Sequence, residues 1–312
     1  MPTLTLTVGL PGCGKTTWAV EEVRKSKSKI ININSDDICE SISGSKKFFK
    51  FNDANEQYVT DMQFSAAEHA SKNEWNIIVS DTNLKKGVRD KWKNWADSHG
   101  YDYKEKNFFA EFKPKANTGA DLHEYFKIKE FARLCKQRNL QRENSVPEKM
   151  IDIMLDKYYY GAMKSIPASL LYGASEDCIL VDIDGTLAHK WNRDPFDETT
   201  VLQDTPDEEV ILSILAEAKY TGRKIIVMSG RTEGCRADTE QWLQTWGIPY
   251  EALFMRAIGD QRPDDAVKYD LYCKHVAPYY RVKKVYDDRD QVVQMYRKLL
   301  GFKVFQVEYG NF

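Results

Sequence analysis

The stretch Gly9-Leu10-Pro11-Gly12-Cys13-Gly14-Lys15-Thr16 places strong limits on the fold of this chain. It matches the spacing Gly-x-x-x-x-Gly-Lys-Thr, in which a glycine-rich loop between a strand and a helix holds nucleotide phosphates. The flanks fit, because residues 4–8 form a short apolar run and residues 17–26 have helical composition. We therefore expect an α/β sheet with this loop at the carboxyl end of its first strand.

A second motif lies about half a chain further on. The sequence Asp182-Ile183-Asp184-Gly185-Thr186 directly follows the apolar run Cys178-Ile179-Leu180-Val181. Residues two positions apart in a strand share a face, so one carboxylate can attack a substrate while the other handles protons. Gly185 permits the sharp turn that brings backbone amides close to an anion. One chain is thus expected to carry both a phosphate-donor site and a phosphate-removing site.

Strand-like and helix-like segments alternate in both halves of the chain. In the first half we expect strands at 4–8, 29–33, 76–80 and 103–109, with helices at 17–26, 55–71 and 86–98. In the second half we expect strands at 179–181, 224–228, 283–286 and 302–307, with helices at 206–221, 238–246, 264–276 and 290–300. This alternation predicts two doubly wound parallel-sheet domains of the α/β class. We place them at 1–160 and 177–312, joined by a turn-rich linker at 161–176.

Bulk composition excludes several classes of protein. A net charge of −2 gives no global attraction to nucleic acids or membranes, and 42% hydrophobic residues is ordinary for a globular protein. Six scattered cysteines without a Cys-x-x-Cys pair indicate neither a disulfide framework nor a zinc site, so a reducing cytoplasm is expected. No leader pattern and no apolar run near ~20 residues is visible, and we therefore expect no membrane contact.

Candidate kinase residues follow the predicted strands of the first half. Backbone amides of residues 12–16 would cradle the β-phosphate, Lys15 would balance phosphate charge, and Thr16 would ligate Mg²⁺. Asp36 follows the second strand, where it can accept the proton of an attacking hydroxyl. An N-cap at Ser35 or Asp36 is an equally good explanation. Asp81 follows the third strand and can position metal or substrate, or cap a helix.

Two stretches rich in basic residues could serve a function, or could reflect only solvent exposure or packing. Residues 127–142 hold six basic side chains against one acidic residue, and Arg138 and Arg142 are placed to act in a lid over the phosphates. A solvated helix face is the alternative. Residues 46–51 interleave basic and aromatic side chains, a composition suited to stacking on single strands. Interior packing of Phe48 and Phe51 is the favoured explanation.

The order of the motifs adds a resemblance to a known family. Asp182–Thr186, Met228-Ser229-Gly230-Arg231, Lys268 and Asp287-Asp288 form the four-part pattern of haloacid-dehalogenase (HAD) phosphohydrolases. With the first loop they are joined by Met62-Gln63-Phe64, Ser80-Asp81-Thr82-Asn83-Leu84 and Lys274-His275-Val276-Ala277-Pro278. End to end, the chain resembles the polynucleotide 5′-kinase/3′-phosphatases of T-even bacteriophages. The resemblance implies a P-loop kinase domain fused to a HAD-like phosphatase domain.

The resemblance also implies residue roles. Asp182 would be the nucleophile and Asp184 the acid and base, while Ser229 and Lys268 would bind phosphoryl oxygens. The implied Mg²⁺ ligands are Thr16 in the kinase half and Asp182, Asp184, Asp287 and Asp288 in the phosphatase half. The implied substrate contacts are Asp81, Arg193 and Arg231, and the kinase catalytic residues are Lys15, Asp36 and Arg142. The implied ATP-binding set is Gly9, Pro11, Gly12, Cys13, Gly14, Lys15, Thr16, Thr17, Arg138 and Arg142.

One position departs from the family pattern. Three residues after the general base, where the family docks the acceptor phosphate with an arginine, this chain has Cys39. A thiol cannot form the charge-assisted fork that arginine makes to phosphate. A weaker kinase, a different acceptor geometry, or compensation by Lys46 or Lys47 would each follow. If the first holds, arginine at position 39 should tighten the acceptor Michaelis constant.

The leading hypothesis is a bifunctional enzyme that phosphorylates 5′-OH ends and removes 3′-phosphates, including 2′,3′-cyclic ends, from RNA or DNA before a ligase acts. ATP and Mg²⁺ are the implied cofactors, and the resemblance implies a homotetramer in a host-cell cytoplasm. Two alternatives stay open. One is a kinase and phosphatase fusion for small metabolites. The other is an end-binding protein with a weakened kinase half.

Overall fold

Parallel sheets form the centre of both halves of the chain. The computed structural model describes every residue except 46–47, 165, 168–169, 172–173, 191–193, 195–196 and 311–312. Residue contacts group the chain into a first unit, Met1–Pro114 with Ile128–Met163, and a second unit, Lys115–Lys127 with Lys164–Phe312. The change at residue 164 lies inside the predicted linker. Residues 115–127 group with the second unit, although the sequence reasoning placed them in the first.

The first unit contains a four-stranded parallel sheet in the order β2-β3-β1-β4. Leu4 and Leu6 of β1 are buried in the apolar cluster on the sheet, beside Ile77 and Val79 of β3. The strands are β1 (Thr3–Val8), β2 (Ile30–Ile33), β3 (Asn76–Val79) and β4 (Asp102–Asn107). The predicted strands all exist with ends shifted by one or two residues. The parallel α/β class is confirmed.

Several helices belong to the same half of the chain. They are α1 (Lys15–Lys25), α2 (Ser35–Ser43), α3 (Asp53–Ser71), α4 (Lys86–Ser98), α5 (Glu124–Leu140), α6 (Glu148–Tyr158) and the short η2 (Tyr160–Ala162). Trp92 and Trp95 of α4 pack with Ala67 of α3 on the apolar side chains of β1 and β3. A separate apolar cluster joins Leu10 of the glycine-rich loop to α5 and α6. The glycine-rich loop is therefore held in place by apolar packing against α5 and α6.

The second unit contains a five-stranded parallel sheet in the order β11-β10-β5-β8-β9. Its strands are β5 (Glu176–Val181), β8 (Lys224–Thr232), β9 (Ala252–Arg256), β10 (Tyr280–Arg289) and β11 (Val304–Gly310). The sequence reasoning missed β9, an edge strand of five residues. A two-stranded antiparallel ribbon, β6 (Ala188–His189) with β7 (Thr205–Pro206), follows the end of β5.

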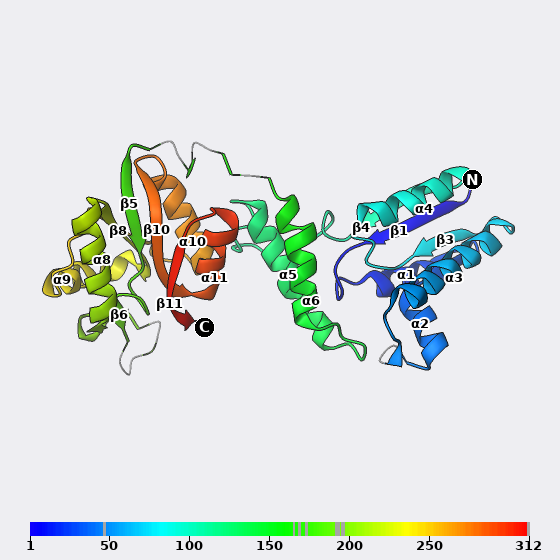
Figure 1. Ribbon diagram of the computed structural model, residues 1–312, viewed down its shortest axis with the longest axis horizontal. Coiled ribbons are helices and arrows are strands. Elements are labelled where there is room, and N and C mark those ends of the chain that lie inside the picture. Colours follow the sequence, from blue (N-terminus) through cyan, green and yellow to red (C-terminus); the bar gives the residue numbers. More distant parts are fainter. Residues whose placement is uncertain are drawn as a thin grey trace. The chain divides into compact units, whose positions relative to one another are not determined.

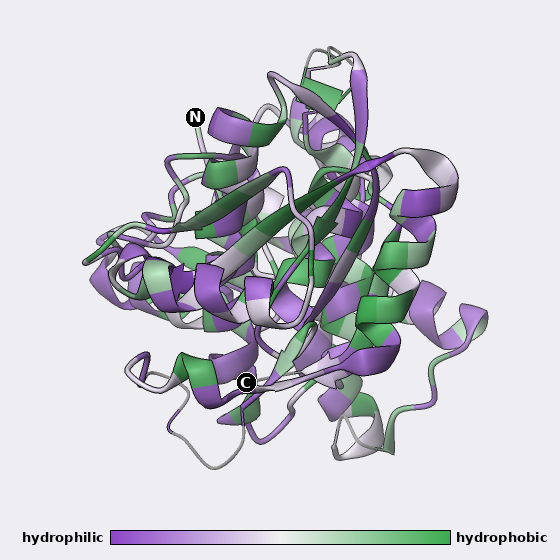
Figure 2. Cartoon of the chain, turned by 90° about the vertical axis from the view of Figure 1, so that its left-hand side faces the viewer, coloured by the Kyte–Doolittle hydropathy of each residue, from purple (hydrophilic) through white to green (hydrophobic). Residues whose placement is uncertain are grey.

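Helices cover both faces of the second sheet. In Figure 1, α8 (Glu208–Thr221) and α9 (Arg236–Thr245) lie on one face, and α10 (Asp264–Leu271) and α11 (Asp290–Gln294) lie on the other. Ile214 and Trp242 pack on Ile179, Val181 and Val227 in the first of these layers. The strands in Figure 2 carry the hydrophobic colour along much of their length. The remaining short helices are η3 (Val201–Gln203), η4 (Glu233–Cys235), η5 (Tyr272–Val276) and η6 (Met295–Leu299).

Local sequence explains several element ends. Asp207 accepts a hydrogen bond from the backbone N–H of Val210 and so caps α8, and Gly222, at φ 70°, ends that helix in the left-handed conformation. The predicted helices 264–276 and 290–300 are both real, but each finishes in a π-helical segment, η5 and η6. All six cysteines lie among the described residues and are free thiols. Within the described part of the chain, we find no helix with the length and apolarity to cross a bilayer.

Candidate active sites

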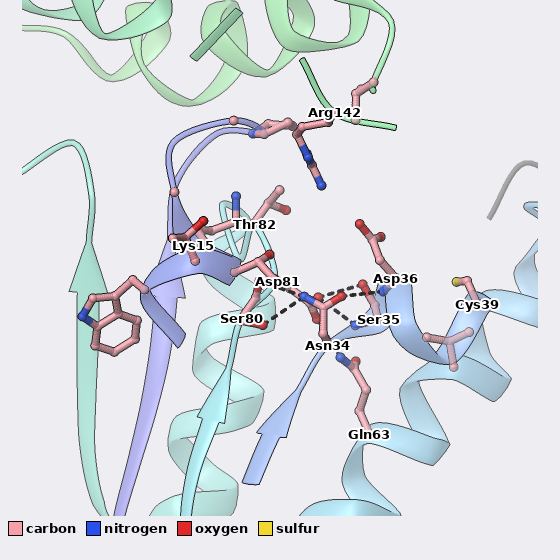
Figure 3. A pocket seen from close by; sticks show the side chains of 18 of the residues that line it. Lys15, Asn34, Ser35, Asp36, Cys39, Gln63, Ser80, Asp81, Thr82 and Arg142 are labelled. Carbon is pink, nitrogen blue, oxygen red and sulfur yellow. Dashed lines mark hydrogen bonds between the residues drawn. The ribbon is translucent and has the colours of Figure 1, made fainter. Parts of the chain in front are cut away.

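The first unit has a cavity of about 980 Å³ at the carboxyl ends of its strands (Figure 3). Its size is at the upper end of the usual range for ligand pockets, roughly 300–1,000 Å³. The lining brings together the glycine-rich loop, the ends of β2 and β3, and the end of α5. The lining residues from the predicted set are Pro11, Gly12, Gly14, Lys15, Thr16, Thr17, Asp36, Asp81, Arg138 and Arg142.

The loop conformation depends on glycine. Gly12 and Gly14 have φ of 79° and 104°, which other residues rarely adopt. A Cβ on Gly12 would lie 2.2 Å from the carbonyl oxygen of Cys135, so no side chain fits between the loop and α5. Cys13 is buried against the apolar cluster of α5 and α6. The side chain of Cys13 therefore supports the loop from behind.

Lys15 is the buried cation of this site. Its Nζ donates to the carbonyl oxygens of Gly9, at 3.1 Å, and Leu10, at 2.7 Å. Burial lowers the pKa of Lys15, and the nearby charge of Arg142 lowers it further. A bound phosphate would favour the charged ammonium again. The electrostatics therefore suit an anionic ligand.

Asp36 projects into the cavity from the first turn of α2. The cap of α2 is Asn34, whose side chain accepts from the backbone N–H of Asp36 at 2.9 Å. The predicted cap at Ser35 or Asp36 was therefore wrong. Figure 3 shows the Asp36 carboxylate directed toward the space between Lys15 and Arg142. That position is where an acceptor hydroxyl would meet a phosphate held by the loop.

Asp81 fastens the end of β3 to the start of α2. Its Oδ1 accepts from the backbone N–H of Ser35 at 2.9 Å and from the Ser35 hydroxyl at 2.7 Å. Its Oδ2 accepts from Nε2 of Gln63 at 2.6 Å. Burial raises the pKa of Asp81, and these hydrogen bonds oppose that shift. The geometry supports a positioning role for Asp81 on the segment that carries Asp36.

Arg142 reaches the cavity from a loop that is closed by a side chain. Asn139 donates to the carbonyl oxygen of Val146 at 2.7 Å and accepts from its N–H at 3.0 Å. The backbone N–H of Arg142 donates to the carbonyl oxygen of Asn139 at 3.1 Å. Figure 3 shows the Arg142 side chain extending into the cavity. The loop thus presents a cation to the cavity that the phosphate-binding turn also lines, and its role as a lid stays a prediction.

A second site lies at the carboxyl end of the sheet in the second unit. Asp182, directly after β5, and Asp287 and Asp288, in β10, each offer a buried carboxylate oxygen, and these oxygens lie within 4.8 Å of one another. A Cβ on Gly185 would come within 2.1 Å of Oδ2 of Asp288, so this turn also requires glycine. Three buried carboxylates form a donor set that suits Mg²⁺.

Lys268 of α10 is the counter-charge of these carboxylates. Its Nζ lies 2.8 Å from Oδ1 of Asp182, 2.9 Å from Oδ2 of Asp287 and 3.5 Å from Oδ2 of Asp264. Burial raises the pKa of Asp182 and Asp287, and Lys268 opposes both shifts. Burial also raises the pKa of Asp288, to about 7, with the Asp182 carboxylate adding to the shift. One lysine therefore balances only part of the acidic charge.

Asp184 belongs to a different contact set. Arg231 donates to both carboxylate oxygens of Asp184, at 3.1 Å and 2.9 Å, and to Oδ2 of Asp204 at 2.7 Å. Nζ of Lys190 lies 3.7 Å from Asp184. The Arg231 side chain is only 2% exposed. These contacts support a role for Arg231 in holding Asp184. The group of mutually close carboxylates does not include Asp184, so its role as a Mg²⁺ ligand stays a prediction, as does the contact of Arg231 with substrate.

The remaining predicted residues have mixed outcomes. Ser229 is fully buried at β8, where its hydroxyl accepts from the backbone N–H of Arg231 at 3.2 Å. Arg193 lies outside the described residues. Asp264 was missed, although it stands four residues before Lys268 in a predicted helix, and that spacing was a usable signal of contact. Asp204 carried no signal in the sequence.

Two family models match this chain, one in each half. Residues 4–160 match the family described as AAA domain. Residues 176–312 match the family described as the polynucleotide kinase PNKP phosphatase domain.

Individual relatives match across nearly the whole chain. A protein of Autographa californica nuclear polyhedrosis virus, named as a bifunctional polynucleotide kinase/RNA ligase, is 26% identical over 316 residues. The match covers 97% of this chain, which spans only 42% of the viral protein. Among solved structures, a chain of the Pnkp1/Rnl/Hen1 RNA repair complex is 29% identical with a TM-score of 0.44 and coverage of 100% of this chain and 97% of that one. A chain in another structure of the Pnkp1/Rnl/Hen1 complex is 28% identical with a TM-score of 0.43. The match covers 100% of this chain and 98% of that one.

Proposed function

We propose a function on the premise that this chain belongs to the AAA domain family through residues 4–160, half of its length, and carries a polynucleotide kinase phosphatase domain in residues 176–312. The proposal is a two-site enzyme that heals nucleic-acid ends. The first site transfers the γ-phosphate of ATP to 5′-OH ends of RNA or DNA. The second hydrolyses 3′-phosphate ends, including 2′,3′-cyclic ends.

The single observation that carries the proposal is the pairing of two phosphate chemistries in one chain. A glycine-rich loop with a buried lysine faces Asp36 across one cavity. A cluster of three buried aspartates with Lys268 lies at the edge of the other sheet. The first arrangement suits transfer to a hydroxyl, and the second suits hydrolysis through a carboxylate nucleophile.

In the kinase site, each described residue has a role that its position supports. The loop amides and Lys15 would hold the β- and γ-phosphates of ATP, and Thr16 would ligate Mg²⁺, which offsets phosphate charge. Asp36 would accept the proton of the attacking 5′-hydroxyl, whose oxygen then bonds to the γ-phosphorus as ADP leaves. Arg142 would stabilise the charge that spreads over the transferring group.

In the phosphatase site, Asp182 would attack the phosphorus of the 3′-phosphate. The bond to the 3′-oxygen breaks as Asp184 donates a proton to that oxygen, and an aspartyl-phosphate remains. Asp184 then takes a proton from water, whose oxygen bonds to the same phosphorus as the bond to Asp182 breaks, so that inorganic phosphate leaves and the Asp182 carboxylate is restored. Asp182, Asp287 and Asp288 would hold Mg²⁺, and Lys268 and Ser229 would bind phosphoryl oxygens.

The polymeric substrate rests on the family of the second unit and on the viral relative's name. That relative joins the kinase to an RNA ligase in one protein, which supports RNA ends as substrates here and cooperation with a ligase. A homotetramer in the cytoplasm of a host cell remains part of the proposal through the family resemblance.

Two variants test the proposal with one substrate, an oligonucleotide that bears a 5′-OH and a 3′-phosphate. With labelled ATP and Mg²⁺, Asp36→Ala should lose only phosphate transfer, and Asp182→Ala should lose only phosphate release. Loss of both activities in either variant would reject independent sites.

Assays with small substrates and with oligonucleotide ends distinguish the proposal from its two alternatives. Faster turnover of free nucleosides or sugars than of oligonucleotides would favour a metabolite kinase and phosphatase. Tight binding of ends with no ATP turnover would favour the end-binding protein.

A further inference from the structure

The wall of the first cavity next to Asp36 is apolar and aromatic. Cys39 follows Asp36 by one turn of α2, so both face the same side of the helix. Cys39, Phe49, Phe51 and Val59 all line the cavity. We call these four residues the Phe51 wall. Figure 3 shows the Cys39 thiol beyond Asp36, on the side away from Lys15.

The base of this wall is a packed cluster. Cys39 is 4% exposed and shares an apolar cluster with Phe49 and Val59, which are also buried. The position where the resemblance expects an arginine is thus occupied by a thiol inside a small core. That core packs the middle of α2 against α3.

Phe51 is the exposed part of the wall. Its ring meets the ring of Phe49 edge to face, with centroids 5.0 Å apart and an interplanar angle of 75°. Phe51 nevertheless remains 63% exposed, and Phe48 is 76% exposed. The expectation that Phe48 and Phe51 pack in the interior was therefore wrong. The phenylalanine that is buried here is Phe49. An aromatic ring held by its neighbour and open to a cavity is suited to stacking.

The cations that line the cavity lie at one of its ends, whereas carboxylates line both. Among the described lining residues, the cations are Lys15, Arg138 and Arg142, which belong to the glycine-rich loop and the end of α5. The polar side chains that line the cavity from α3, the helix of Val59, are Glu56, Thr60 and Gln63. A phosphate placed against that end would approach a carboxylate, whereas a heteroaromatic ring would meet Phe51. The wall therefore favours a base over a phosphate.

We propose that the Phe51 wall is the acceptor subsite for the terminal nucleobase. The base of the 5′-terminal nucleotide stacks on Phe51, and its sugar places the 5′-hydroxyl at Asp36. This inference rests on the proposed kinase function and deepens it. Among the explanations for Cys39, it selects a different acceptor geometry, in which the end is recognised by its base more than by its first phosphate.

The first test needs no variant. Two acceptors of identical length and phosphate number are compared at saturating ATP, one with an intact 5′-terminal nucleotide and one with an abasic 5′-terminal sugar. The abasic acceptor should raise the acceptor KM about fivefold or more, as expected for a lost base–aromatic stack, while the KM for ATP stays unchanged. Equal KM values for the two acceptors would overturn the inference.

The second test uses matched phenylalanines. Phe51→Ala should raise the acceptor KM to a similar extent and should make the enzyme insensitive to removal of the base. Phe48→Ala, which alters an exposed ring that does not line the cavity, should leave both values near those of the original protein. Additive effects of Phe51→Ala and base removal would contradict stacking. If Phe51→Ala fails to fold, Phe51→Leu removes the ring while keeping an apolar side chain.

Failure of this inference is distinguishable from failure of the proposed function. If neither acceptor is phosphorylated at any concentration, the kinase proposal fails and this inference with it. If both are phosphorylated with equal KM, the kinase proposal stands and only the base subsite is rejected.

Discussion

The ammonium of Lys268 lies 2.8 Å from Oδ1 of Asp182, and both side chains are almost fully buried. Lys268 also contacts Asp287, so one cation joins the end of β5 to the end of β10. Burial alone would lower the pKa of Lys268, but the carboxylates of Asp182, Asp264 and Asp287 raise it well above its ordinary value. The lysine thus remains charged and holds the acidic site together in the metal-free protein.

Lys268→Met should therefore destabilise the second unit and abolish phosphate release. Removing one partner of a buried ion pair costs about 3–5 kcal/mol, because the remaining charges lose their counter-ion. Urea unfolding measures the loss of stability, and transfer from ATP checks that the first unit is intact. Lys274→Met is the matched control, since Lys274 is a solvent-exposed lysine on the adjoining turn that pairs with Asp270. Equal losses in the two variants would show that the Asp182 contact has no special importance.

Arg231→Lys should lower kcat for phosphate release with little change in KM. Lysine cannot reproduce the two hydrogen bonds that Arg231 donates to Asp184, so the acid would lose its fixed orientation. A misplacement of this kind can cost about 100-fold in rate. Arg236→Lys serves as control, because Arg236 makes a similar fork to Glu233 at the protein surface. A large rise in KM with unchanged kcat would instead favour direct contact between Arg231 and substrate.

The acidic cluster should make the metal-free protein less stable as pH rises. A carboxyl group has a pKa near ~4 when unfolded, whereas burial raises that of Asp288 to about 7 and also raises that of Asp182. The folded state therefore binds more protons between these values, and the free energy of unfolding falls with increasing pH until about 7. Thermal unfolding of the second unit in EDTA, followed from pH 5 to pH 8, measures this slope.

Mg²⁺ should reverse the loss at pH 8. Binding to the folded state alone adds about 2.7 kcal/mol at a concentration 100 times the dissociation constant. Asp288→Asn should reduce both the pH slope and the Mg²⁺ effect, because it removes one titrating ligand. If stability depends on pH in Asp288→Asn as strongly as in the original protein, groups other than Asp288 cause that dependence.

Local patterns were sufficient to predict much of both sites. The glycine-rich loop and the Asp182–Thr186 motif each follow a buried strand, and the carboxyl ends of parallel strands meet at one edge of a sheet. Asp287 and Asp288 were assigned to the cluster by their place in a family pattern, and the structure brings them to Asp182. Residues that are far apart in the sequence are therefore close in space when they end neighbouring parallel strands.

The contacts that the sequence did not reveal join residues from unrelated elements. Asp204 meets Arg231 from a short loop beside η3, and Gln63 reaches Asp81 from the middle of α3. No periodicity marks either contact. The cap at Asn34 was missed for a simpler reason, because Asn34, Ser35 and Asp36 are all good capping residues and the sequence alone does not choose among them.

Asp81→Ala should reduce phosphate transfer and leave phosphate release unchanged. The variant removes the acceptor of the half-buried N–H and hydroxyl of Ser35 and of the buried amide of Gln63, and an unsatisfied buried group costs about 1–3 kcal/mol. The start of α2 would then lose its anchor, and Asp36 its position. Asp90→Ala removes a surface aspartate that pairs with Lys86 and should have little effect. Full transfer activity in Asp81→Ala would show that Asn34 alone positions the helix.

Cys39→Arg tests whether an arginine at this position can bind the acceptor phosphate. The thiol packs against Phe49 and Val59, so arginine would overfill that cluster at a cost of about 1–3 kcal/mol and would displace Phe49 from beneath Phe51. We therefore expect lower stability and a higher acceptor KM, measured by urea unfolding and steady-state transfer from ATP. Cys39→Ala, which stays within the available volume, should keep the KM near its original value. A tighter acceptor KM in Cys39→Arg would mean that the cluster can open, and that the cysteine marks a weakened phosphate contact and not a base platform.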